Sequence, residues 1–267
     1  MTPMPLLALR DLHVRLGHRQ IIEGLSMDVR PGELIGLIGP NGAGKSTLLR
    51  SLAGLIPVRG EITLSGRSGA SLTLAERAAL LAYVPQEHEI AWPMSVERLV
   101  GLGRVPYSGA FALRWGKNDL EAVRQAMERM DVSQFATRSA MALSGGEKAR
   151  VLIARALAQQ TPILIADEPA GGLDPAHQIA LMRIFRALAG EGRAVIATLH
   201  DLALASRWCT RLVVLNHGAI VADGRPEEVL TDDMLADVYG VRAYLGTAAG
   251  GPVVQCLDLS DPETQAP

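Results

Sequence analysis

The feature that most constrains this chain is a glycine-rich segment, GPNGAGKS at residues 39–46, which matches the pattern G-x-x-x-x-G-K-[ST]. The apolar run Leu34 to Ile38 precedes it and predicts a buried parallel strand, and residues 47–52 predict the start of a helix. Glycines at this junction let successive backbone N–H groups point into one concavity, and the helix N-terminus adds partial positive charge. Strand, turn and helix together predict an α/β fold that holds polyphosphate at the turn.

Two side chains of the segment complete a phosphate site. Lys45 can reach the β- and γ-phosphates of a nucleotide, and the Ser46 hydroxyl is placed to ligate Mg²⁺. A glycine-rich turn with an unrelated lysine would give the same short pattern, so the interpretation depends on the rest of the chain. The residues predicted to bind phosphate are Gly39, Pro40, Asn41, Gly42, Ala43, Gly44, Lys45, Ser46 and Thr47.

Composition bounds the class of protein. The chain has 267 residues, 48% of them hydrophobic, which suffices for one large domain with an inserted subdomain. A net charge of −2 gives no basic excess and argues against a nucleic-acid partner. Two cysteines form no disulfide framework and favour a reducing compartment. Residues 1–16 do not resemble a signal peptide, and no 18-residue stretch is fit to span a bilayer, so a role at a membrane would need another anchor.

Three segments around the glycine-rich turn predict strands of a second sheet. Residues 6–16 and 21–29 alternate loosely and carry β-type residues, and residues 61–64 have the same character. We expect them to form an antiparallel flap beside the main sheet. No Phe, Trp or Tyr precedes Tyr83, so stacking on a nucleotide base must use His13, His18, an arginine or an aliphatic side chain.

The middle of the chain, residues 87–160, predicts a mostly helical insertion. A short helix at 73–81, with Leu74 on its apolar face, and a strand ending at Gln86 lead into it. The insertion lacks alternating β-type runs, and residues 119–130 form an amphipathic pattern with Leu120 on the apolar face.

A further helix of the insertion begins at the sequence LSGGE, residues 143–147. Ser144 is the predicted N-cap, and Glu147, three positions on, completes a capping box. The helix is predicted to run to about residue 160. Taken alone, the segment could be no more than a well-capped helix.

Two apolar strands predicted later in the chain end in polar residues. Residues 163–166 lead into Asp167 and Glu168, and residues 194–199 lead into His200. The carboxyl ends of parallel strands share one edge of a sheet, so these groups are expected beside Lys45. A solvated strand end or a structural histidine would give the same local pattern.

The remaining segments complete one domain. We predict a helix at 176–188, a hairpin of 212–215 with 219–222, two short helices within 226–239, and a loosely ordered tail from Thr247. The predicted division is a nucleotide-binding core with the flap at 1–86 and 161–240, a helical subdomain at 87–160, and a C-terminal tail at 241–267.

With these motifs in this order, the chain resembles the nucleotide-binding subunits of ABC transporters from about Leu6 to Tyr239. One phosphate loop is a weak signal, whereas five motifs in family order form a strong one. The resemblance implies a P-loop (RecA-like) nucleotide-binding core with an N-terminal antiparallel β flap and an inserted helical subdomain. The five motifs are the phosphate loop at 39–46, Gln86, the signature at 143–147, the strand with its carboxylates at 163–168, and His200, and Leu173-Asp174 matches the family's D-loop.

Within the family, the chain is similar to the ATPases of importers for iron–siderophore complexes, haem or cobalamin. The similarity lies in the sequence GRVPY at 103–107, the segment around Gln86, and a short C-terminus without a regulatory domain. The chain departs from the usual family pattern at three places. Leu16 lies where an aromatic residue is usual, Glu147 replaces the commonest Gln, and the D-loop at 170–174 is unusually rich in glycine.

The resemblance implies an ATPase that uses ATP and Mg²⁺ and forms ADP and phosphate. Glu168 would be the general base or would orient the attacking water, and His200 would contact the γ-phosphate. The implied catalytic residues are Lys45, Gln86, Glu168 and His200; the implied Mg²⁺ ligands are Ser46, Gln86 and Asp167; and the implied contacts from a second subunit are Ser144, Gly145 and Gly146.

The implied partners are a second copy of the chain in a head-to-tail homodimer, a polytopic membrane permease and, indirectly, a substrate-binding protein. The permease would contact residues 86–107, at the cytoplasmic face of the inner membrane. The alternatives are a soluble ABC ATPase such as an iron–sulfur assembly ATPase, or an importer ATPase for another substrate. The signature and His200 argue against a P-loop kinase or GTPase.

Overall fold

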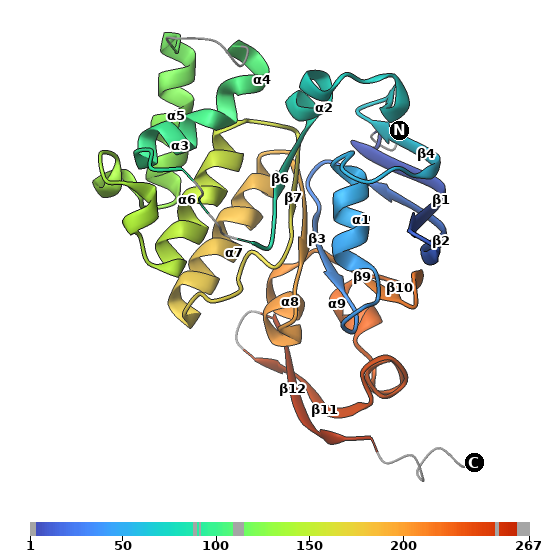
Figure 1. Cartoon of the computed structure of the whole chain (residues 1–267). Coiled ribbons are helices and arrows are strands. Elements are labelled where there is room, and N and C mark those ends of the chain that lie inside the picture. The colour runs from blue at the N-terminus through green and yellow to red at the C-terminus, as the bar shows by residue number, and fades with distance from the viewer. Residues whose placement is uncertain (1–3, 88–89, 91, 109–114, 249–250, 261–267) are drawn as a thin grey trace, which may run out of the picture.

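A computed structural model describes residues 4–87, 90, 92–108, 115–248 and 251–260. Its centre is a six-stranded sheet in the order β10-β9-β3-β8-β7-β6 (Figure 1). All neighbouring strands are parallel except the edge pair β9 and β10, as expected for strands joined by helical crossovers. The strands are β3 (Leu34–Ile38), β6 (Leu81–Val84), β7 (Ile163–Ala166), β8 (Ala194–Thr198), β9 (Arg211–Asn216) and β10 (Ala219–Gly224).

A second, four-stranded sheet has the order β2-β1-β4-β5. Its strands are β1 (Leu7–Leu16), β2 (Arg19–Val29), β4 (Arg59–Leu64) and the short β5 (Arg67–Ser68), and all pairs are antiparallel. The predicted antiparallel flap is therefore confirmed, with β5 in addition.

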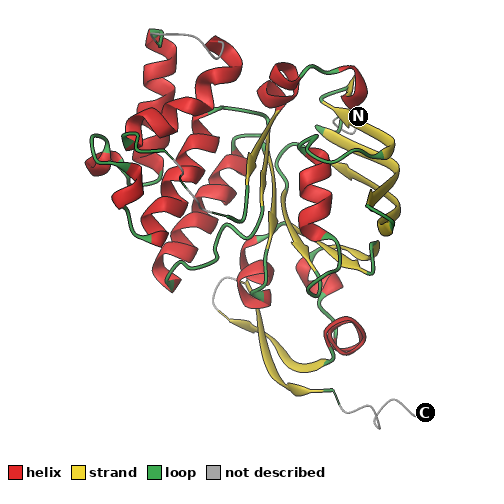
Figure 2. Ribbon diagram, viewed as in Figure 1, coloured by secondary structure: helices red, strands yellow, loops and turns green. Residues whose placement is uncertain are grey.

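Two hydrophobic cores lie on the two faces of the central sheet. Alternate side chains of β7 divide between them: Ile163 and Ile165 pack with α1 (Lys45–Leu52) and the second sheet, whereas Leu164 and Ala166 pack toward the helices of the other face. Figure 2 shows α1 between the two sets of strands and the larger group of helices across the central sheet. The phosphate loop and the helical insertion therefore lie on different sides of one sheet.

The insertion is built from helices, as predicted. They are α3 (Val96–Gly101), α4 (Val105–Ser108), α5 (Lys117–Arg129) and α6 (Gly145–Ala158), with short 3₁₀ turns between them. Residues of α7 (Pro175–Gly190) and α8 (Leu202–Trp208) belong to the same core as those of the insertion. Buried Arg104 joins the turn after α3 to α5 and α6. Its guanidinium pairs with Asp119 of α5 at 2.8 Å and donates to the carbonyl of Ala158 in α6. The residue boundaries of the subdomains stay a prediction.

Two side chains expected on apolar helix faces are exposed. Leu74, in α2 (Leu74–Leu80), and Leu120, in α5, both face solvent. The buried residues of α5 are Ala122, Val123, Ala126 and Met127. The contact face of α5 is thus set by its packing against α3 and α6 and lies to one side of Leu120.

The predicted loosely ordered tail from Thr247 is wrong for residues 251–259. These residues form β12 (Gly251–Leu259), which pairs with β11 (Val241–Ala248) in an antiparallel ribbon beside α8. Glycine, proline and acid content suggested disorder, but buried Val254 anchors the ribbon on the core. Before the ribbon, residues 226–239 form α9 (Pro226–Val229), α10 (Asp232–Met234) and a π turn (Leu235–Tyr239).

Candidate nucleotide site

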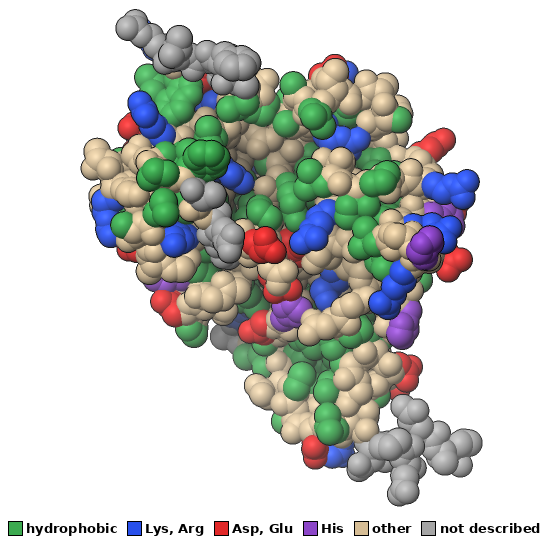
Figure 3. All heavy atoms as spheres, viewed as in Figure 1, with side chains coloured by type: hydrophobic (Ala, Val, Ile, Leu, Met, Phe, Trp, Pro, Cys, Tyr) green, Lys and Arg blue, Asp and Glu red, His purple; other side chains and the backbone are tan. Residues whose placement is uncertain are grey.

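The site lies where β3, β7 and β8 end side by side. Leu37 is paired with Thr198 across β3 and β8, and Ala166 with Ala197 across β7 and β8. The residues that follow each strand, including the phosphate loop, Glu168 and His200, therefore leave the sheet at one edge. Figure 3 shows basic, acidic and histidine side chains meeting near the middle of one face, between the helical part and the strands.

The phosphate loop has the backbone that its glycines predict. Gly39, Gly42 and Gly44 all have positive φ, and a Cβ on Gly39 would clash with the carbonyl oxygen of Leu215 in β9. Gly44 is the N-cap of α1 and offers no side chain to cap it. The first N–H groups of α1 thus remain free to bind an anion.

Lys45 is folded into the loop. Its side chain is buried, and its Nζ donates to the carbonyl oxygens of Gly39, at 2.6 Å, and Pro40, at 3.0 Å. Burial lowers the pKa of Lys45, and the nearby Glu168 and Asp167 carboxylates oppose that shift. A bound phosphate would replace these carbonyls with a stronger, charged acceptor.

Asp167 is fully buried beneath the loop. Its Oδ1 accepts hydrogen bonds from the hydroxyls of Ser46, at 3.1 Å, and Thr198, at 2.9 Å. Its Oδ2 is buried without a hydrogen-bond partner among the described residues. A buried carboxylate oxygen without a partner is costly, and it marks a position for a cation or a water.

Glu168 stands in the left-handed backbone region, with φ of +50°. Its N–H donates to the Thr198 hydroxyl at 2.6 Å, and that hydroxyl donates in turn to Asp167. Its carboxylate lies 2.6 Å from His200 Nε2. Backbone strain of this kind persists only where surrounding contacts enforce it, here at a carboxylate aimed at the phosphate loop. Sequence reasoning missed Thr198, which reads as an ordinary β-branched strand residue.

An open cleft of about 270 Å³ adjoins these groups. Besides the phosphate loop and Glu168, Arg19 and Ile21 from the start of β2 line it. Of the predicted candidates for base stacking, His13 and His18 are not among its described lining residues, whereas Arg19 and Ile21 are an arginine and an aliphatic side chain. The described lining residues are Arg19, Ile21, Asn41, Gly42, Gly44, Lys45, Ser46, Thr47 and Glu168.

Two predicted elements lie outside the cleft in this single chain. Gln86 is exposed in the bend after β6, the edge strand that β7 and β8 separate from β3. Ser144 caps α6, across the sheet from α1, and its backbone N–H and hydroxyl both donate to the Glu147 carboxylate. The predicted capping box is therefore formed. Its hydrogen bonds lower the pKa of Glu147. Gly145 and Gly146 follow it in the first turn of α6.

Tyr239 is a second residue that sequence reasoning missed. It ends the π turn, and its phenol lies close to the backbone of Gly39. Burial raises the pKa of Tyr239 to about 12, and the Gly39 backbone opposes that shift. The first glycine of the phosphate loop is therefore held between β9 and the C-terminal part of the chain.

Comparison with known proteins agrees with this geometry. Residues 22–171 match the family model described as ABC transporter. The chain is 41% identical over 252 residues to the cobalamin import ATP-binding protein BtuD of Halobacterium salinarum, covering 94% of this chain and 63% of that relative. It is 43% identical over 235 residues to the hemin import ATP-binding protein HmuV of Streptomyces coelicolor, covering 88% of this chain and 83% of that relative.

The fold has close counterparts among solved structures. A chain of a putative metal-chelate type ABC transporter in an inward-facing conformation superposes with a TM-score of 0.81 at 24% identity, covering 96% of this chain and 98% of that one. At this identity the likeness concerns the fold alone.

Proposed function

The chain belongs to the ABC transporter family, and on that premise we propose that it hydrolyses ATP to power import of a metal chelate through a separate permease. The cargo class is an iron–siderophore complex, haem or cobalamin. Relatives named as cobalamin and hemin import ATP-binding proteins support that class. The observation that carries the proposal is the meeting of Lys45, Ser46, Asp167, Glu168 and His200 at one edge of the sheet.

Binding of the nucleotide is attributed to the phosphate loop. The free N–H groups at the start of α1 and the Lys45 ammonium face one cleft, which suits the β- and γ-phosphates of ATP. In this proposal Lys45 exchanges its bonds to Gly39 and Pro40 for phosphate oxygens. Arg19 and Ile21 stand at the same cleft and are the candidates for contact with the sugar and base.

The residues below the loop fit a divalent cation. Asp167 Oδ2 is buried without a partner among the described residues, and the Ser46 hydroxyl lies on the same carboxylate. Oxygen donors of this kind are the ligands that Mg²⁺ prefers. Bound Mg²⁺ would neutralise charge on the phosphates. Ser46 and Asp167 would hold it; Gln86 is proposed as a further ligand and would have to approach from its exposed position after β6.

Glu168 and His200 perform the proton chemistry in this proposal. The Glu168 carboxylate faces the cleft and can orient a water and accept its proton. His200 Nε2 contacts that carboxylate, so it holds the side chain in place, and it is proposed to contact the γ-phosphate. The hydrogen bond between the Glu168 N–H and Thr198 fixes the backbone that presents the carboxylate.

The far side of the γ-phosphate needs a second chain. Within one chain α6 and α1 lie on opposite faces of the sheet, so Ser144, Gly145 and Gly146 are proposed to act on the nucleotide of a partner subunit. A helix N-terminus is suited to that anion. The proposed assembly is a head-to-tail homodimer with two ATP molecules between the subunits, closed by ATP and released by hydrolysis.

The proposed membrane partner is a polytopic permease that contacts residues 86–107, with a substrate-binding protein as an indirect partner. In the described part of the chain, no helix combines the length and apolarity needed to cross a bilayer. We propose that the protein is held at the cytoplasmic face of the inner membrane by that permease.

The deciding experiment is extraction from the native membrane in mild detergent, followed by identification of bound proteins. Two copies of this chain with two copies of one polytopic permease would support the transporter, whose cargo is then tested among iron chelates, haem and cobalamin. Recovery with soluble partners alone would overturn it in favour of a soluble ABC ATPase, such as one for iron–sulfur assembly.

A further inference from the structure

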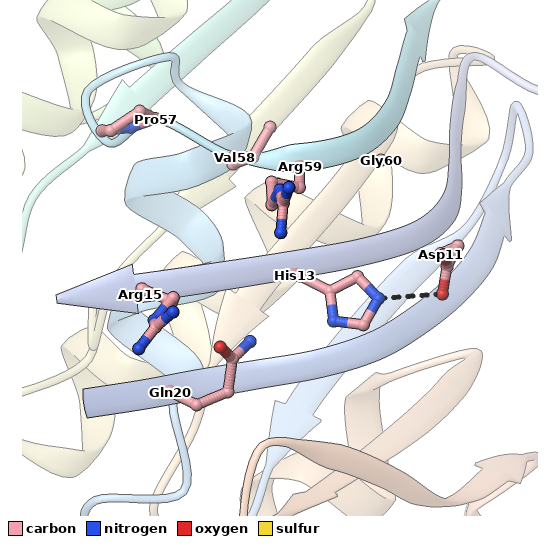
Figure 4. Close-up of a pocket in the computed structure, with 8 residues that line it drawn as sticks. All are labelled: Asp11, His13, Arg15, Gln20, Pro57, Val58, Arg59 and Gly60. Atoms are coloured by element: carbon pink, nitrogen blue, oxygen red, sulfur yellow. Dashed lines mark hydrogen bonds and ion pairs between the residues drawn. The ribbon is translucent and has the colours of Figure 1, made fainter. Parts of the chain in front are cut away.

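A separate groove of about 450 Å³ lies on the four-stranded sheet (Figure 4). It is on the outer face, because Leu12, Val14 and Ile22 of the same strands are buried in the core on the inner face. Its lining residues are Asp11, His13, Arg15, Gln20, Pro57, Val58, Arg59 and Gly60. Figure 3 shows basic and histidine side chains at the edge of the molecule formed by this sheet.

Strand register sets the polar side chains of the groove side by side. Arg59 on β4 is paired with His13 on β1, and Gln20 on β2 is paired with Arg15 on β1. Figure 4 shows these four side chains gathered where the three strands run together. They stand on a hydrogen-bonded sheet, so their Cα positions are fixed independently of any ligand.

His13 is held by two contacts. Its Nδ1 accepts the N–H of Gly24 at 3.3 Å, so its Nε2 carries the hydrogen and donates to Asp11 Oδ1 at 3.0 Å. This contact orients the Asp11 carboxylate toward the imidazole. The one acid of the lining is thereby engaged with His13.

The two arginines of the groove have no carboxylate partner among the described residues. Arg15 donates to the carbonyl of His18 at 3.3 Å, and neither Arg15 nor Arg59 takes part in an ion pair in the described part of the chain. By contrast, Arg10 on the same face of β1 pairs with Asp28 at 2.7 Å. The groove therefore holds two guanidinium groups whose charge no described carboxylate neutralises by a direct ion pair.

The spacing of these arginines suits a phosphate. In the β1–β4 register Arg59 faces His13, so Arg15, two residues on, is its diagonal neighbour. Diagonal neighbours lie about 7–8 Å apart at the backbone, within reach of long side chains. A tetrahedral oxyanion can accept bonds of about 2.7–2.9 Å from a guanidinium on each side and bridge such a gap. It would also relieve the repulsion between the two like charges.

We propose that this groove binds a soluble phosphate monoester with a small apolar substituent. Arg15 and Arg59 bind the phosphate, Gln20 adds its amide, and Pro57 and Val58 form the wall against the substituent. The proposal stands independently of the ATPase activity proposed above.

The groove is placed to influence the nucleotide cleft. Arg19 and Gln20 are consecutive residues of β2, and one lines the cleft while the other lines the groove. A ligand bound by Gln20 and Arg15 would thus contact the end of the hairpin that carries Arg19. We expect the ester to change the KM for ATP through this hairpin.

Backbone amide NMR on the full chain, with the nucleotide cleft filled by ADP, tests the binding. Phenyl phosphate and inorganic phosphate are titrated separately. We expect saturable shifts at amides of β1, β2 and residues 57–60, and tighter binding of phenyl phosphate because of Pro57 and Val58. Shifts confined to residues 39–47, or no saturation, would overturn the proposal, because the phosphate would then use the nucleotide site or none.

Variants separate a built site from general surface charge. Arg15→Gln and Arg59→Gln should each weaken phenyl phosphate binding about tenfold, as expected for loss of a charged hydrogen bond. Arg10→Gln is the matched control on the same sheet face and should change it less than about twofold, within the usual range for surface substitutions. Equal loss in all three variants would contradict the proposal. Binding to anionic lipid vesicles without binding to either soluble probe would overturn the assignment to a soluble ester.

Discussion

The Glu168 carboxylate lies 2.6 Å from Nε2 of His200, although the two residues follow different strands of the sheet. Both side chains are partly exposed at the phosphate-loop edge, where a water and a γ-phosphate would have to approach. The contact holds the carboxylate that we propose as the proton acceptor, and Glu168 is therefore the first residue to test.

Glu168→Gln should abolish turnover and leave ATP binding intact. An amide cannot accept the proton from water, so kcat should fall by at least about a hundredfold. Because ATP then persists, the closed dimer should accumulate in size-exclusion chromatography. Phosphate release and nucleotide binding are measured on the same preparation, with Glu191→Gln, an exposed glutamate at the end of α7, as control. Hydrolysis at the unmodified rate would show that Glu168 is not the base.

Thr198→Val should impair catalysis as well as folding. The substitution removes the hydroxyl that joins Asp167 to the N–H of Glu168, leaving both without that partner. Stability should fall by about 1–3 kcal/mol and kcat by at least about tenfold. Thr210→Val is the matched control, since its hydroxyl bonds the backbone of Leu34 at the other end of β3. It should lose similar stability in urea and keep kcat; an equal loss of kcat would make the role of Thr198 purely structural.

The protein should recognise the nucleobase of its nucleotide only weakly. Leu16 stands where the family usually has an aromatic side chain, and the β2 side chains that line the cleft are Arg19 and Ile21. Ring stacking is worth about 1–3 kcal/mol per base in nucleic-acid systems, so its loss should leave only a modest preference for ATP over GTP. Arg19→Ala should raise the KM for both nucleotides by a similar factor. A hundredfold preference for ATP would show that another residue recognises the base.

Tyr239 should contribute to stability in a manner that depends on alkaline pH. Burial raises its pKa from 10.0 to about 12, so the phenol ionises in the unfolded chain before it does so in the folded one. Its contribution is fully present below pH 10 and is lost as the pH rises toward 12. Urea unfolding at pH 9 and 11 should show a smaller loss for Tyr239→Phe than for the unmodified chain, by roughly 1–2 kcal/mol.

Two comparisons complete the Tyr239 test. At neutral pH the same variant should raise the KM for ATP, because the phosphate loop loses the phenol hydroxyl beside Gly39. The exposed Tyr244→Phe should change neither quantity. An identical pH dependence of stability in both variants would show that Tyr239 does not cause the loss at alkaline pH.

Local patterns were enough to predict the strand ends and the loop. Buried parallel strands such as β3 and β7 read as short apolar runs, and the residues directly after each run emerge at the same edge of the sheet. Local patterns could not predict the strained backbone of Glu168 or the hydrogen bonds of the Thr198 hydroxyl. Their roles come from neighbours about 30 residues away in the chain.

Other features depended on contacts that a linear pattern does not carry. Arg19 reaches the cleft because the β1–β2 hairpin folds over α1, and Tyr239 reaches Gly39 from the far end of the chain. The ribbon of β11 and β12 failed as a prediction because composition suggested disorder, whereas the apolar surface of α8 supplies a place to fold upon. The role proposed for Ser144 cannot be seen in one chain, since its predicted ligand would belong to another subunit.

The contacts that Leu215 and Tyr239 make with Gly39 have a consequence for synthesis on the ribosome. The glycine is translated well before the residues that contact it, because Leu215 packs against it from β9 and Tyr239 lies near it in the π turn. A nascent chain that has emerged only as far as α8 contains the whole phosphate-loop sequence but lacks both Leu215 and Tyr239. The two contacts on Gly39 can therefore both be present only once the chain has been synthesised through Tyr239.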